Sequence, residues 1–144
     1  MKHHGCTSEY NRERGLDIVR AYHEHIASVA IIRTNDIFHT IVKMPSKRFW
    51  VSEERAAFVI RAIMKGDKLL YMRSNRRAMF FDIYARYIKL HRLFPHRRLI
   101  ELVSIIIHQC APRFYLTPNS AKVYFYRYKE EWKKIQQQKL LHSR

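Results

Sequence analysis

Residues able to carry out covalent chemistry are sparse in this sequence. Its 144 residues include 12 Asp and Glu, 9 His and 2 Cys. There is no Gly-rich phosphate loop, no pair of carboxylates at helical spacing in an apolar stretch, and no nucleophile beside a base. We therefore expect a protein that is not an enzyme and that uses no cofactor.

Histidine and cysteine near the amino terminus form the first grouping that resembles a metal site. His3, His4 and Cys6 could together hold a metal ion. They stand in a stretch without hydrophobic periodicity, so no scaffold is predicted to fix them. Cys6 is expected to be a tail thiol, and the distant Cys110 a small buried residue.

Three further histidines are poorly placed as joint ligands. His23 and His25 are two positions apart, which puts them on different faces of a helix. His108 and Cys110 have the same spacing, and His108 is expected to be a hydrogen-bonded histidine of the core. The sequence predicts no metal site.

Lysine and arginine are the residues whose number and placement do suggest a binding chemistry. The formal net charge is +16 and the isoelectric point is about 10.3. Residues 1–72 carry 12 basic and 8 acidic side chains, whereas residues 73–144 carry 16 and 4. An excess of this size favours a polyanionic partner, most often nucleic acid, and the second half should supply most of the attraction.

A repeated sequence pattern organises the chain. Residues 48–52, Arg-Phe-Trp-Val-Ser, return 65 positions later at 113–117 as Arg-Phe-Tyr-Leu-Thr. The same offset relates Asp17 to Asp82 and Tyr22 to Tyr87. We interpret this as a tandem duplication of a three-helix unit.

The first copy is predicted over 10–72, after a disordered tail at 1–9. A helix is expected from about 11 to 32, and a short one follows the capping side chains at 34–36. Ser52 should cap a third helix that ends at Gly66.

The second, more basic copy is predicted over 73–135 and is followed by a basic polar tail at 136–144. Its first helix should begin at Ser74 or Asn75 and end near Phe94. The nearly all-apolar stretch 99–110 should be a buried central element. Thr117 and Pro118 should then start a helix that continues toward residue 138.

The aromatic residues ahead of each capping residue admit two interpretations. Phe49 and Trp50, like Phe114 and Tyr115, could staple the chain to the first turn of the following helix. They could instead stack on bases, and the structural role is favoured. Arg48 and Arg113 could similarly cap the carboxyl end of a neighbouring helix.

The order of helices resembles that of three-helix DNA-binding modules, with the last helix of each copy offered to a groove. The first of these helices opens with Glu53 and Glu54, which would repel phosphates, so the second is the predicted reader. The candidate nucleic-acid-binding residues are Arg76, Arg77, Arg97, Arg98, Arg113, Asn119, Ser120, Lys122, Tyr126, Arg127, Lys133 and Lys134.

The sequence therefore predicts an all-α protein of two pseudo-repeated units on a shared core. Its predicted function is non-catalytic binding of double-stranded DNA, as a small regulator of transcription or an accessory factor. Single-stranded RNA or DNA binding, or assembly with an acidic protein through Phe58 and Tyr126, stays open. A homo-oligomer also stays open as a partner.

Membrane insertion and export are not expected. The longest strongly apolar stretch, 99–107, is short and contains Glu101. The amino terminus lacks an apolar signal core. We expect a cytoplasmic protein without a membrane partner.

Overall fold

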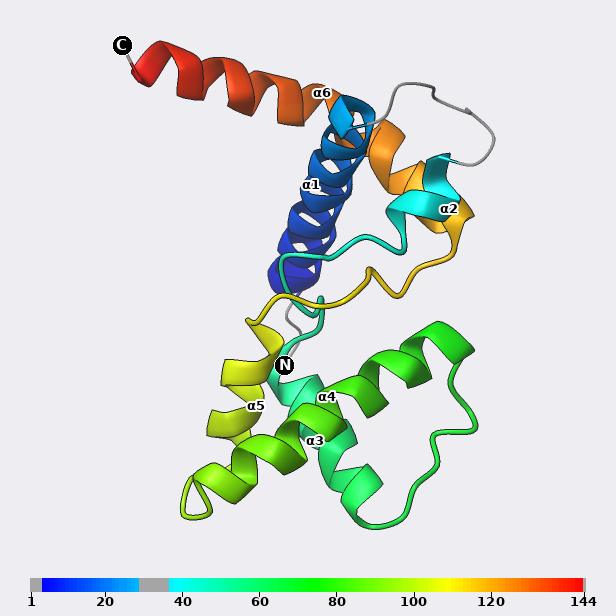
Figure 1. The fold of residues 1–144 in the computed structure, drawn as a ribbon, viewed down its shortest axis with the longest axis vertical. Helices are drawn as coiled ribbons and strands as arrows, with labels where there is room; N and C mark the ends of the chain where they lie inside the picture. Colours follow the sequence, from blue (N-terminus) through cyan, green and yellow to red (C-terminus); the bar gives the residue numbers. More distant parts are fainter. Residues whose placement is uncertain (1–3, 29–36, 144) are drawn as a thin grey trace. The chain divides into compact units, whose positions relative to one another are not determined.

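The computed structural model describes residues 4–28 and 37–143, and these residues form six α-helices (Figure 1). The helices are α1 (His4–Ser28), α2 (Ile37–Ile41), α3 (Glu53–Met64), α4 (Ser74–Leu93), α5 (Leu99–Ile107) and α6 (Pro118–His142). The described residues contain no β-strand, and an isolated bridge joins Ser46 to Ala111. The predicted all-α class is confirmed.

The helices sort into two compact units, and each unit takes helices from both halves of the chain. Unit 1 comprises Met1–Met44 and Leu116–Arg144, and unit 2 comprises Pro45–Tyr115. In unit 1, α6 packs on α1 and α2; in unit 2, α3 packs on α4 and α5. This grouping differs from the predicted boundaries 10–72 and 73–135, which followed chain order. Helix α3 belongs to the first half of the chain but packs on α4 and α5 of the second half. Helix α6 belongs to the second half but packs on α1 and α2 of the first half.

Unit 2 is built around α5, which contacts both α3 and α4. One face of α5 buries Leu102, Val103, Ile106 and Ile107, as expected for the apolar stretch, although Ile105 is exposed. The core that they form with α3 and α4 includes Val59, Ile60, Phe80, Ile83 and Leu69. The apolar stretch is therefore the central element of this unit.

The ends of α3 follow the sequence closely. The Ser52 hydroxyl accepts a hydrogen bond from the backbone N–H of Arg55 at 3.1 Å. Gly66 has a φ of 101°. Its N–H reaches the carbonyl of Ile63 at 2.9 Å, while the N–H of Asp67 reaches that of Ala62 at 3.0 Å. This is the paired closure that a glycine after a helix makes possible.

Two connectors pair inside unit 2. Ser46 and Ala111 exchange backbone hydrogen bonds of 3.0 Å in both directions. The Phe49 N–H then donates to the Ile107 carbonyl at 2.9 Å, which satisfies a carbonyl at the end of α5. The Phe49 ring is fully buried and stacks on Tyr115 at a centroid distance of 6.0 Å. Phe49 and Tyr115, two of the four aromatic residues before the caps, therefore belong to the core of unit 2.

Aromatic rings join the three helices of unit 1. The Tyr22 ring of α1 lies 4.1 Å from the Phe125 ring of α6, between centroids. Phe38 of α2 lies 5.6 Å from the same Phe125 ring. The rings pack beside the buried aliphatic residues Ile18, Val19 and Ile41. Tyr22, Phe38 and Phe125 thus tie α1, α2 and α6 together.

Gly15 allows α1 and α6 to approach closely. A Cβ atom at this position would lie 2.1 Å from Cδ2 of the Tyr128 ring and 2.9 Å from its Cγ. Such a contact cannot be relieved by moving only the tip of the tyrosine. Gly15 is therefore a packing residue despite the low helix propensity of glycine.

Replacing Gly15 with valine should lower the free energy of unfolding by about 1–3 kcal/mol, because the added methyl groups overpack the helix contact. Thermal and urea unfolding measure the change. The same substitution in a Tyr128→Ala background should cost less, since the ring is gone. Equal costs in both backgrounds would show that this contact does not limit the residue at position 15.

Both terminal helices are longer than predicted. Helix α1 begins at His4, within the segment 1–9 that was expected to be a tail, and α6 continues to His142, through most of 136–144. The capping cluster predicted at 34–36 and the predicted end of the first helix at 32 lie outside the described residues. Polar residues such as Gln136–Gln138 lack apolar periodicity but have good helix propensity, which the pattern-based boundary underweighted.

Two predictions about buried residues near α5 are wrong. His108 is exposed, and one of its ring nitrogens lies 2.7 Å from the Ser104 carbonyl oxygen. Cys110 is also exposed. Helix α5 ends at Ile107, so positions 108–110 fall in the turn beyond its buried stripe rather than on it.

Candidate nucleic-acid interface

The outward face of α6 carries the densest group of predicted binding residues. Helix α6 packs on α1 and α2 through residues that recur at three and four positions, including Ala121, Phe125, Tyr128 and Trp132. Six of the predicted residues lie on the remaining face and are exposed: Asn119, Lys122, Tyr126, Arg127, Lys133 and Lys134. Lys129 reaches over the Tyr126 ring, at 4.9 Å from its centroid. The side of α6 that faces away from α1 and α2 is therefore polar and exposed to solvent.

Ser120 has a structural role instead of an outward one. The Thr117 hydroxyl caps α6 by accepting the Ser120 N–H at 3.1 Å, and it donates to the Ser120 hydroxyl at 3.0 Å. Pro118 occupies the first turn, as predicted. The Ser120 side chain is half-buried and engaged in the cap, whereas neighbouring Asn119 is exposed.

The acidic residues of α6 are both in ion pairs, which limits their repulsion of an anion. Glu131 pairs with Arg12 of α1. Glu130 lies 3.9 Å from the Lys133 ammonium. The helix has six Lys and Arg against these two carboxylates, so its net charge is +4. Ion pairing leaves Lys122, Arg127 and Lys134 as exposed cations.

Arg14 and His23 of α1 position α6 through its aromatic residues. Arg14 donates to the Tyr124 hydroxyl, and that hydroxyl donates to Asn11 Oδ1 at 3.1 Å. The His23 ring stacks on Trp132 with centroids 4.3 Å apart. These contacts fix the rotation of α6 about its own axis.

The His23–Trp132 stack should make unit 1 sensitive to acid. Burial, and secondarily the Lys133 charge, lower the pKa of His23 below its usual value of 6.5. The unfolded chain therefore binds a proton more readily than the folded one. The stability contributed by neutral His23 is present above pH 6.5 and is lost as the pH falls below it.

We expect His23→Gln to flatten the decline in melting temperature between pH 7.5 and 5.5. The two proteins share every other histidine, so the difference between the two curves isolates His23. Parallel curves would mean that the stacked ring does not sense pH.

The predicted residues of unit 2 do not form one patch. Arg76 and Arg77 lie at the start of α4, while Arg97 and Arg98 lie past its other end. A helix of 20 residues is roughly 30 Å long, so these two pairs are far apart. They cannot contact the same phosphate group.

Arg77 and Arg113 are partly occupied by contacts inside unit 2. Arg77 donates to the Met72 carbonyl at 3.3 Å, and Arg113 lies over the Tyr115 ring at 4.8 Å. Arg76 is exposed and reaches over Phe80 at 5.3 Å. Arg97 and Arg98 are exposed, each lies 3.5 Å from Glu101, and they share this residue as an acidic partner.

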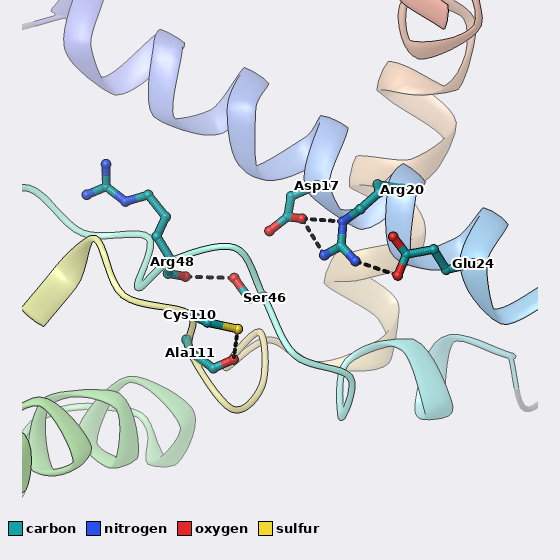
Figure 2. A network of polar contacts seen from close by, with 7 residues as sticks. All are labelled: Asp17, Arg20, Glu24, Ser46, Arg48, Cys110 and Ala111. Carbon is teal, nitrogen blue, oxygen red and sulfur yellow. Dashed lines mark hydrogen bonds and ion pairs between the residues drawn. The ribbon is translucent and has the colours of Figure 1, made fainter.

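Arg48 contributes hydrogen bonds to the connector ahead of α3. Its guanidinium donates to the carbonyls of Phe49 at 3.1 Å and Val51 at 3.0 Å, within its own connector. The Arg48 carbonyl in turn accepts from the Ser46 hydroxyl at 2.7 Å, as Figure 2 shows. Arg48 thus braces the turn that leads into α3.

Sequence reasoning missed several polar residues that make hydrogen bonds or ion pairs within one unit or the other. In unit 1, buried Asp17 accepts from Arg20 at 2.9 Å, and Arg20 also reaches Glu24 at 2.9 Å (Figure 2). In unit 2, the Tyr115 hydroxyl donates to Asp82. Burial and this carboxylate raise the pKa of Tyr115 well above its usual value. The match of Asp17 with Asp82 at the 65-residue offset was the sequence feature that could have indicated these two carboxylates.

Arg86 was also missed as a structural residue. It donates to Gln109 Oε1 and to the Cys110 carbonyl, both at 3.0 Å. Its guanidinium lies 4.8 Å from the centroid of the Phe49 ring. Arg86 therefore fastens the turn after α5 to α4.

No family model matches the chain, and neither a curated protein nor a solved structure is similar to it. Within the described residues, no helix is long and apolar enough to cross a membrane. Nor do those residues group three or more His, Cys, Asp or Glu side chains as a metal ion would need. The outward face of α6, where Lys122, Arg127 and Lys134 are exposed, is the candidate site.

Proposed function

We propose that this protein binds double-stranded DNA through the outward face of α6, as a non-catalytic regulator or accessory factor. The observation that carries the proposal is the exposure of Lys122, Arg127, Lys133 and Lys134 on one helix whose opposite side packs on α1. An α-helix of this kind fits the major groove, where lysine and arginine contact phosphates and Asn119 can contact base edges.

Duplex DNA is favoured over a single strand because of where the aromatic residues lie. Binding of single strands relies on exposed rings that stack on bases. Phe49, Phe80 and Phe114 are buried instead, and Tyr22 packs on Phe125. The exposed rings Phe58, Tyr71 and Phe94 belong to unit 2 and are not on α6. Tyr126 is the exposed ring on the proposed face of α6, at 55%.

Fluorescence anisotropy with a labelled random-sequence duplex tests the proposal. Affinity should fall steeply between about 50 and 200 mM salt, since phosphate contacts release counterions. Unlabelled duplex should compete better than single strands of the same sequence. Absence of binding at low salt would eliminate the function, and preferential competition by single strands would replace it with the single-strand alternative.

We also propose that the chain arose by duplication of a helical trio. Pairs of residues separated by 65 positions are alike in burial: Ile18 and Ile83, Ile41 and Ile106, and Ala56 and Ala121 are all buried. The caps at Ser52 and Thr117 also accept from the residue three positions ahead. An experimental structure in which α1, α2 and α6 fail to superpose on α4, α5 and α3 would refute this origin.

A further inference from the structure

The turn between α4 and α5 combines basic residues with two exposed apolar side chains. Leu93 is 73% exposed and Phe94 is 49% exposed. Around them stand the exposed Arg92, Arg97 and Arg98. No acidic residue occurs from position 83 to position 100. Glu101 lies 3.5 Å from both Arg97 and Arg98, so the turn carries three arginines against one carboxylate around an exposed apolar tip.

The turn is held by backbone and side-chain contacts. The Phe94 N–H donates to the Leu90 carbonyl at 3.0 Å, and the Arg97 N–H donates back to the Phe94 carbonyl at 3.2 Å. The Glu101 carboxylate accepts the Arg98 N–H at 3.1 Å, and this hydrogen bond, ahead of the nearby arginines, lowers the pKa of Glu101. Because the tip is already ordered, binding there costs little conformational entropy.

We propose that Leu93 and Phe94 form a wedge that inserts between base pairs from the minor groove of a bound duplex, with Arg92, Arg97 and Arg98 on the flanking phosphates. This inference rests on the proposed DNA-binding function. Proteins that read the minor groove commonly combine arginine with such an apolar wedge, and they kink the duplex by roughly 20–90°. The guanidinium groups suit phosphates because they can donate two parallel hydrogen bonds.

Anionic membrane is the competing occupant, and the size of the apolar tip argues against it. Helices that lie in a membrane interface bury an apolar face that spans several turns. Here the exposed apolar group is the end of one helix, Leu93 and Phe94, and the next apolar residues, Leu99 and Ile100, are half-buried. Two side chains are enough for one base step.

The wedge is tested with a short duplex that carries a fluorescent donor and acceptor at its two ends. Wild-type protein should raise energy transfer on binding, because a kink shortens the distance between the ends. The Leu93→Ala/Phe94→Ala variant should lose most of this rise while keeping its salt dependence. Phe58→Ala is the matched control, since Phe58 is also exposed, at 62%, and lies on α3.

The outcomes separate the wedge from the function. Duplex binding without a change in energy transfer, or an equal loss in Phe58→Ala, overturns the wedge and leaves DNA binding intact. Absence of duplex binding removes the proposed function and the wedge with it. The tip would be assigned to a membrane if wild-type protein sedimented with vesicles rich in anionic lipid and left the duplex straight, and if the double variant no longer sedimented with the vesicles. Circular dichroism should show that the double variant keeps its helix content. A Phe94→Leu variant, which keeps an apolar side chain at the tip, should still kink the duplex, and this result would support the wedge.

Discussion

Removing four positive charges from the outward face of α6 should lower duplex affinity on the order of 10²- to 10³-fold near physiological salt. The changes are Lys122→Gln, Arg127→Gln, Lys133→Gln and Lys134→Gln. Each lost phosphate contact should reduce the slope of log affinity against log salt by about 0.9, so four contacts should reduce it by roughly 3–4. Glutamine keeps good helix propensity, so α6 should remain folded. Anisotropy titrations at several salt concentrations give both quantities.

The control must remove the same charge at other exposed positions. Lys43→Gln, Arg61→Gln, Lys65→Gln and Lys68→Gln change exposed side chains outside α6. This variant should lose much less affinity, because charges away from the interface act mainly through the screened field of the whole protein. Similar losses in the two variants would show that attraction is spread over the molecule and is not concentrated on α6.

Replacing Phe49 with alanine should lower the free energy of unfolding by about 3–5 kcal/mol, the largest stability effect that we expect. The ring is fully buried, stacks on Tyr115 and lies under the Arg86 guanidinium. Its removal leaves a cavity and takes away one side of the Arg86 contact. Urea unfolding followed by circular dichroism gives the change in midpoint.

Phe58→Ala is the matched substitution, since the same residue type lies on the exposed face of α3. It should change the free energy of unfolding by less than about 0.5 kcal/mol. Together the two variants also test the role of the repeated aromatic motif. Were Phe49 a base-stacking residue, its alanine variant would keep its stability and lose affinity for nucleic acid instead.

Local signals in the sequence predicted the helices and their caps well. Ser52, Gly66, Thr117 and Pro118 act in the structure through short-range backbone chemistry, which depends on neighbouring residues alone. The nearly all-apolar stretch 99–110 likewise predicted the central helix of its unit, although the helix ends at Ile107. Such features need no knowledge of the rest of the fold.

Pairing between distant helices could not be predicted in the same way. That α6 packs on α1 depends on Gly15 facing Tyr128 and on Tyr22 facing Phe125, and neither pair leaves a mark in local periodicity. The same limit applies to the site. Charge alone grouped Arg77 with Lys122 as candidate binding residues, whereas Arg77 donates to the Met72 carbonyl and Lys122 is exposed on α6.

Mapping amide chemical shifts of the full chain during titration with a short duplex tests the α6 interface most directly. We expect the perturbed residues to cluster on the outward face of α6, from Asn119 to Lys134, and at the Leu93–Phe94 wedge, with Ala121 and Phe125 shifting little. Perturbations centred on Arg55, Phe58 and Arg61 of α3, with α6 unchanged, would contradict the account.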